Sequence, residues 1–204
     1  IPHLADRFEW LDALPTHMNG IVLGNEVLDA LPVRLVHATP TGIMETGVVR
    51  TAEGYAYEDR PADAPLASAT ELLELPDDYR TEICTSLPAF IGSLASMLGK
   101  GAMLFIDYGF PRSEYYHQQR NRGTLMCHYR HHAHDDPFAL VGLQDITAHV
   151  DFTAVAEAAV THGLDVLGYI SQARFLLNAG LMEEVAATPA DDVVRYAPLA
   201  SQAQ

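Results

Sequence analysis

The chain has few cysteines, few basic residues and no long hydrophobic run. Cys84 and Cys127 are the only cysteines among its 204 residues, and neither lies in a CxxC motif. This excludes a disulfide framework and favours a reducing compartment. No apolar run reaches the roughly 18 residues of a membrane-spanning helix, and no signal-peptide pattern is present. We therefore expect no membrane insertion.

Basic residues are outnumbered by acidic ones. Twelve Lys and Arg against 27 Asp and Glu give a formal net charge of −15. Such a charge argues against binding to nucleic acid or to an anionic membrane. It suits a protein partner with a basic segment, although solubility alone would also explain it. The apolar fraction of 49% excludes a disordered chain.

Several catalytic signatures are also missing. The sequence contains no GxSxG elbow, no phosphate-binding P-loop and no GxGxxG fingerprint. A histidine-rich tract at 127–136 offers imidazole, thiolate and carboxylate groups, but its spacing matches no metal motif and Arg130 would oppose a cation. We predict no metal site there, and instead a polar, mobile loop beside an active site.

Short apolar runs predict a parallel sheet. Ile21–Leu23 and Ala102–Ile106 are apolar throughout, as in strands that are covered on both faces. Helical spacing over Thr85–Leu98 places a helix directly before the second strand, which indicates a right-handed crossover. A third strand is expected at 164–170, and two more helices are expected at 152–162 and 173–181.

An antiparallel insertion is predicted after the first strand. Apolar segments between 33 and 57 are separated by Gly- and Pro-containing turns, which is typical of a meander. We expect one helical turn at 27–31, ended by Pro32, a loop at 59–69, and a short helix or strand at 69–75. The predicted class is therefore α/β, with residues 1–32 and 70–204 in the main domain and 33–69 in the insertion.

Polar residues follow the first two predicted strands. Asn25 and Glu26 come after one strand, and Asp107 and Tyr108 come after the other. Ligands of open α/β sheets bind at such carboxyl ends. Glu26 and Asp29 share a face if the segment is helical, where they could bind a cation or accept a proton. Equally, Asn25 could cap the short helix while the two acids stabilise its positive end.

Five segments, in order, resemble signatures of the MidA family of methyltransferases that use S-adenosyl-L-methionine (SAM). Residues 24–33 (GNEVLDALPV) match its NE-x-x-DALPV signature. The other four are Phe105–Gly109 (x-x-DYG), Arg122–Leu125 followed by His128 (RGT-L), Asp145–Phe152 (DIT-AHVDF), and Gln172–Gly180 (Q-x-x-FL-x-x-x-G).

The resemblance implies a Rossmann-like class I methyltransferase fold with inserted elements, with SAM as cofactor and S-adenosyl-L-homocysteine (SAH) as product. It implies that Glu26 and Asp29 hold an acceptor guanidinium and help to remove its proton. Asn25 and Trp10 are expected on the cofactor side. The expected substrate-side residues are Asp107, Tyr108, Asp145, Thr147, His149 and Asp151, and for Asp151 a helix N-cap is an equal alternative.

The resemblance also implies protein arginine N-methylation of a partner such as a respiratory complex I subunit. It is compatible with a homodimer, and with the cytoplasm of a bacterium or the mitochondrial matrix of a eukaryote. The family's glycine-rich loop and ribose-binding acid precede the NE signature, so we expect this chain to be a C-terminal portion. The alternative is a non-catalytic assembly module, in which the insertion and the histidine tract bind a partner protein.

Overall fold

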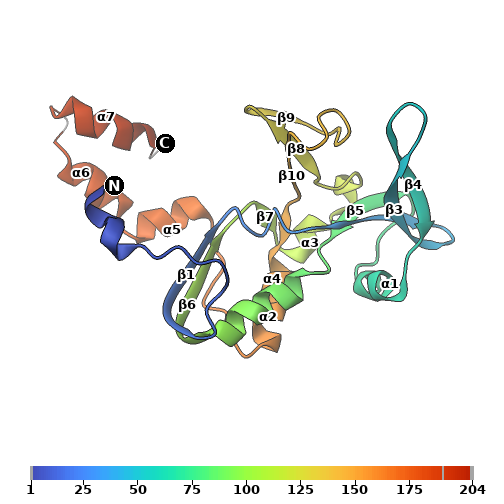
Figure 1. Cartoon of the computed structure of the whole chain (residues 1–204), viewed down its shortest axis with the longest axis horizontal. Coiled ribbons are helices and arrows are strands. Elements are labelled where there is room, and N and C mark those ends of the chain that lie inside the picture. Colours follow the sequence, from blue (N-terminus) through green and yellow to red (C-terminus); the bar gives the residue numbers. More distant parts are fainter. Residues whose placement is uncertain (1, 190, 203–204) are drawn as a thin grey trace. The chain divides into compact units, whose positions relative to one another are not determined.

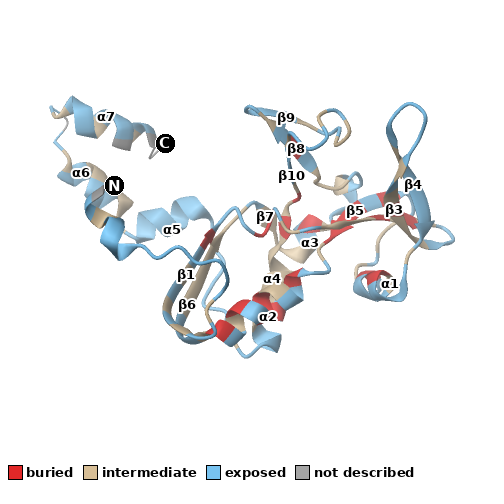
Figure 2. Cartoon of the chain, in the orientation of Figure 1, coloured by how far each residue is buried: buried red, intermediate tan, exposed pale blue. Residues whose placement is uncertain are grey.

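The computed structural model describes residues 2–189 and 191–202 and separates the chain into two compact units that divide after Val166 (Figure 1). The second unit contains α5 (Gln172–Asn178), α6 (Leu181–Ala187) and α7 (Val193–Gln202). The helix predicted at 173–181 is confirmed as α5. Figure 2 shows that buried residues gather in the first unit, whereas α5 and α6 have none. Both hydrophobic cores therefore lie in the first unit.

The first unit contains the predicted parallel strands. β1 (Met18–Asn25) pairs in parallel with β6 (Leu98–Ile106), which follows α2 (Leu87–Met97). Gly24 lies opposite Phe105, whose ring approaches to 2.7 Å from where a Gly24 Cβ would stand. α2 and α4 (Phe152–Thr161) pack together around the buried side chains of one core: Leu28, Leu87, Ile91, Val150 and Ala158.

The antiparallel insertion is confirmed and is larger than predicted. β2 (Arg34–Thr39), β3 (Gly42–Arg50) and β4 (Tyr55–Pro61) form a meander, and β5 (Tyr79–Ile83) joins it in the order β4-β3-β2-β5. α1 (Ala64–Thr70) contributes Leu66 to a second core with Val36 and Ile83. The sheet thus extends beyond the 33–69 range.

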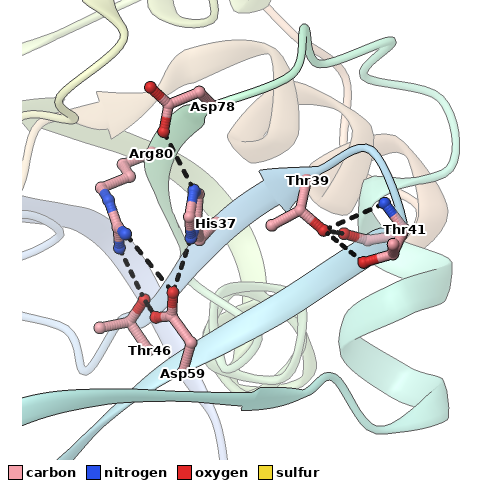
Figure 3. Close-up of polar contacts among 8 residues, drawn as sticks. His37, Thr39, Thr41, Thr46, Asp59, Asp78 and Arg80 are labelled. Atoms are coloured by element: carbon pink, nitrogen blue, oxygen red, sulfur yellow. Dashed lines mark hydrogen bonds and ion pairs between the residues drawn. The ribbon is translucent and has the colours of Figure 1, made fainter.

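One polar network crosses the whole antiparallel sheet (Figure 3). His37 of β2 lies between Asp59 of β4 at 2.6 Å and Asp78 at 3.3 Å. Arg80 of β5 donates to the Thr46 hydroxyl of β3 and to Asp59. Because each strand supplies one member, the network fixes the register of all four strands.

Shorter elements connect the two cores. β7 (Gly109–Phe110) pairs in parallel with β11 (Val150–Asp151), and β10 (Asp145–Thr147), β8 (Met126–Tyr129) and β9 (His132–His134) form an antiparallel sheet. The remaining elements are η1 (Pro2–Arg7), α3 (Arg112–Tyr115) and η2 (Gln118–Arg120). Among the helices described, none has the length and apolar character to cross a membrane.

Three predicted elements near the insertion are wrong. Residues 27–31 form a turn rather than a helix, and Glu26 before them adopts a φ of 50°, outside the right-handed helical region. The loop predicted at 59–69 is instead the end of β4 followed by α1, whose N-cap is the Asp63 carboxylate. The element predicted at 69–75 is the end of α1 and a turn.

Two further predictions are wrong, and both concern strand pairing. Residues 164–170 are irregular, and Leu167 is 86% exposed. A strand needs a neighbouring strand to pair with, and none of the sheets in the described part of the chain includes these residues. Conversely, the histidine tract is not a loop but the β8–β9 hairpin. Arg130 and His131 have φ of 47° and 67°, as in a tight type I′ turn.

Candidate functional site

The carboxyl end of β1 presents two polar side chains. Asn25 is the last residue of β1, and the backbone N–H of Glu26 donates to the carbonyl of Ile106 at 2.9 Å. Both side chains are exposed, and neither has a hydrogen-bond partner among the residues described. Ile21 and Leu23 alternate with Asn25 along the same strand and are 73% and 64% exposed. This strand end therefore offers an amide, a carboxylate and an open apolar surface.

Asp107, at the end of β6, serves the backbone of the neighbouring turn. Its Oδ2 accepts hydrogen bonds from the N–H groups of Val27 at 3.1 Å and Leu28 at 2.8 Å. Its Oδ1 accepts from the N–H of Tyr108 at 3.0 Å, and the Tyr108 side chain is 62% exposed. The structure thus brings the two predicted polar strand ends together, and Asp107 holds Glu26 and Asp29 in place through this turn.

Asp29 is a buried carboxylate among other carboxylates. It is 8% exposed. Burial raises its pKa above the usual range, and the negative charges of Asp107, Glu26 and Asp145 raise it further. Its carbonyl accepts the N–H of Ala148 at 3.1 Å, which ties this turn to the Asp145–Phe152 segment. A concentration of negative charge at a buried site favours a cationic ligand.

A cleft of about 640 Å³ has Asp29 among its lining residues. One wall is formed by residues 29–35, a second by side chains of β3 and β4, and a third by Leu125 and residues within 137–148. Of the predicted site residues, Asp29 and Thr147 line this cleft. Asn25, Glu26 and Asp107 lie on the β1–β6 side of Asp29 rather than in the cleft. Three aromatic residues that also line it, Tyr55, Tyr57 and Phe138, could not be predicted from sequence patterns.

Glu82 is a further residue that the sequence did not indicate. It is 4% exposed, and its carboxylate accepts hydrogen bonds from the N–H groups of Thr124 and Leu125, the Thr124 hydroxyl and the Tyr115 hydroxyl. Burial raises the pKa of Glu82, although these donors lower it. A lone acid in the run Tyr79–Ile83 carries no sequence signal of burial. The contact fixes the loop that contains Thr124 against β5.

The remaining predicted residues have separate surroundings. The backbone N–H of His149 donates to the Thr124 hydroxyl at 3.0 Å, and burial and the nearby Arg120 lower the pKa of its ring. Asp151 caps α4, since Oδ1 accepts from Thr153 and Ala154 N–H, and Oδ2 pairs with Arg112 at 3.2 Å. Asp145 begins β10, and Trp10 is 92% exposed in the segment before β1.

The residues at the end of β1 fit one side of a site for the methyl donor. The unpartnered amide of Asn25 can bind hydroxyl or ammonium groups, and Leu23 adds an apolar surface beside it. No grouping of three or more His, Cys, Asp and Glu side chains among the described residues is placed to hold a metal ion.

Comparison with known proteins identifies the family. Residues 1–170 match the family model described as "Putative S-adenosyl-L-methionine-dependent methyltransferase". The chain is similar to a crystal structure from Burkholderia thailandensis described as a "likely methyl transferase" bound to S-adenosyl-homocysteine, with 51% identity and a TM-score of 0.94. A native crystal structure from the same organism gives the same identity and TM-score. The match covers all of this chain, and 53% and 55% of those chains.

A curated relative is "Protein arginine methyltransferase NDUFAF7, mitochondrial" from Danio rerio, which is 30% identical over 168 residues. That match covers 79% of this chain and 37% of the relative. The chain thus spans about half the length of its structural relatives and little more than a third of the curated one. The α/β fold, the family model and these relatives agree, and the chain belongs to the MidA-type family of SAM-dependent methyltransferases.

Proposed function

We propose that the protein to which this chain belongs transfers a methyl group from SAM to an arginine side chain of another protein. The observation that carries this proposal is the buried carboxylate of Asp29 at the start of the cleft, with Glu26, Asp107 and Asp145 around it. A guanidinium group is the cationic side chain that matches paired carboxylates best. The name of the Danio rerio relative supports the same acceptor.

The proposed chemistry assigns separate tasks to two carboxylates. SAM, when bound, supplies an electrophilic methyl group on a sulfonium ion. The Glu26 carboxylate is exposed and accepts no hydrogen bond from the residues described. It can therefore orient the guanidinium by accepting hydrogen bonds from its N–H groups. Asp29 has a raised pKa, which makes it a better acceptor for the proton that the nitrogen loses as the N–C bond forms. Asp107 positions both by fixing the turn between them.

A complex I subunit is a candidate partner on the family resemblance, in the mitochondrial matrix or the bacterial cytoplasm. The second candidate function is a non-catalytic assembly module. It is favoured by one observation: most of the cleft lies between the antiparallel insertion and the β8–β10 region, beyond the end of β1. The two functions differ in their need for Glu26: methyl transfer requires its carboxylate, and a non-catalytic assembly module does not.

The test uses the full-length protein. Calorimetry measures SAH binding, and SAH release measures methyl transfer to a peptide of alternating Gly and Arg. We expect Glu26→Gln to lower methyl transfer by at least about 100-fold while SAH affinity changes by less than about twofold. Glu58→Gln, at an exposed site on β4, should leave both unchanged.

Absence of SAH binding would overturn the methyltransferase proposal and favour the assembly module. Retained turnover in Glu26→Gln would remove Glu26 from the mechanism. Methyl transfer to a lysine peptide but not to the arginine peptide would show that the acceptor is lysine rather than arginine.

A further inference from the structure

Three aromatic side chains cluster at the part of the cleft contributed by β4. The Tyr57 and Phe138 rings are 4.9 Å apart between centroids, and the Tyr55 and Phe138 rings are 6.2 Å apart with an interplanar angle of 29°. The two tyrosines come from β4, whereas Phe138 comes from the turn after β9. Tyr55 and Tyr57 are 49% and 44% exposed, so their rings are accessible to a ligand. We call these three residues the aromatic trio.

The surroundings of the cleft leave no uncompensated positive charge in its lining. Arg34 is its one basic lining residue, and it is already paired with Glu45 at 2.8 Å and Asp63 at 2.9 Å. Asp29 supplies negative charge at one end. Asp136 supplies it beside the trio, where its Oδ1 accepts the N–H of Phe138 at 2.9 Å.

Aromatic faces and carboxylates together select a cation. An Arg or Lys head group is attracted to the face of a ring, and its aliphatic stem packs on apolar side chains. Val48, Val141 and Ile146 add apolar side chains to the lining. A volume of about 640 Å³ accommodates a few side chains of an extended segment but not a folded domain.

We propose that this cleft binds a basic segment of the protein substrate, with the acceptor side chain at Asp29 and a neighbouring cationic side chain on the aromatic trio. This inference rests on the proposed function, because it extends the acceptor site into a docking site. The net charge of −15 complements such a segment. Specificity would then depend on the distance between two cations in the substrate rather than on the acceptor alone.

The experiment measures binding of a fluorescent peptide of alternating Gly and Arg to the full-length protein by anisotropy. The comparison peptide has Glu in place of Arg. We expect Phe138→Ala to weaken binding of the Arg peptide about tenfold, and Tyr57→Phe, which keeps the ring, to change it less than about twofold. Tyr129→Ala is the matched control, because Tyr129 lies on β8 but does not line the cleft.

Folding is checked by thermal melting, and Phe138→Leu, which keeps apolar bulk without a ring, replaces Phe138→Ala if the latter unfolds. Equal affinity of wild type and a folded Phe138 variant would overturn the docking site, as would equal binding of the Glu peptide. Ring-dependent binding without any methyl transfer to the bound peptide would overturn the arginine acceptor and support the docking site. The two proposals therefore fail in different ways.

Discussion

Glu82 and Thr124, 42 residues apart in the chain, form a buried contact in which one carboxylate accepts both the backbone N–H and the hydroxyl of the threonine. The same carboxylate binds the N–H of Leu125 at 3.1 Å, and Leu125 lines the cleft. The Thr124 hydroxyl oxygen in turn accepts the N–H of His149. A single carboxylate on β5 thus positions two segments of the family's signatures against the antiparallel sheet.

Replacing this carboxylate should be costly. Glu82→Ala leaves the N–H groups of Thr124 and Leu125 buried without their acceptor, so we expect a loss of about 3 kcal/mol in the free energy of unfolding. Urea denaturation measures it. Glu58→Ala, at an exposed position on β4, should change stability by less than about 0.5 kcal/mol. Equal effects of the two substitutions would mean that the loop is held by other contacts.

Glu45 should make the antiparallel sheet sensitive to acid. Hydrogen bonds from Arg34 and Arg60 lower the pKa of Glu45 to about 2. Because the folded-state pKa lies below the unfolded one, the stabilisation is complete above about pH 5 and is lost as the pH falls towards 2. We expect Glu45→Gln to cost about 1–2 kcal/mol at pH 7, since Arg60 is largely exposed. Melting temperatures of the two proteins should converge near pH 2, and a constant difference across this range would contradict the assignment.

Asp151 should act on stability through the start of α4. Asp151→Asn keeps the cap on Thr153 and Ala154 but loses the charge pair with Arg112, which we expect to cost about 1 kcal/mol. Asp151→Ala removes both and should cost about 2 kcal/mol. Chemical denaturation and SAH calorimetry are measured together. If a folded Asp151 variant loses SAH or peptide affinity by more than its loss of stability accounts for, Asp151 has a role in substrate binding as well.

The sequence predicted elements whose signal is local. The apolar runs around Ile21 and Leu104 became the paired strands β1 and β6, and the spacing at 85–98 and 152–162 became α2 and α4. The polar residues that follow the two runs, Glu26 and Asp107, are predicted at the carboxyl ends of these strands, and the structure brings them together.

Elements that depend on distant partners could not be predicted in this way. β5 contains Arg80 and Glu82, and these charged residues interrupt the apolar pattern that would predict a strand. Its pairing with β2 joins segments that are distant in the sequence. The run at 164–170 has the opposite character, since it is mostly apolar but belongs to no strand in the part of the chain described. The aromatic trio could not be predicted from the sequence either, because Tyr57 and Phe138 come into contact only when the insertion packs against the turn after β9.

Asp29 should show a conflict between stability and activity. Its carboxylate is buried, and its pKa is raised by that burial and by Asp107, Glu26 and Asp145. A raised folded-state pKa means that the native state binds the proton more tightly, so the charge costs stability as the pH rises above the unfolded value. Asp29→Asn removes this cost with little change in shape. We expect it to stabilise the protein by about 1 kcal/mol at pH 7, which raises the melting temperature by roughly 2–4 °C.

The same substitution should remove the proton acceptor and one partner of the guanidinium. Methyl transfer should therefore fall by about 100-fold or more, while SAH affinity stays within about twofold. Asp165→Asn, at an exposed position, is the matched control for both measurements. The stability difference should shrink as the pH falls through the raised pKa, because wild-type Asp29 then becomes neutral. If Asp29→Asn instead destabilises the protein, the carboxylate makes a net favourable contribution to folding. Its burial would then not be a cost to stability that is explained by a cationic ligand.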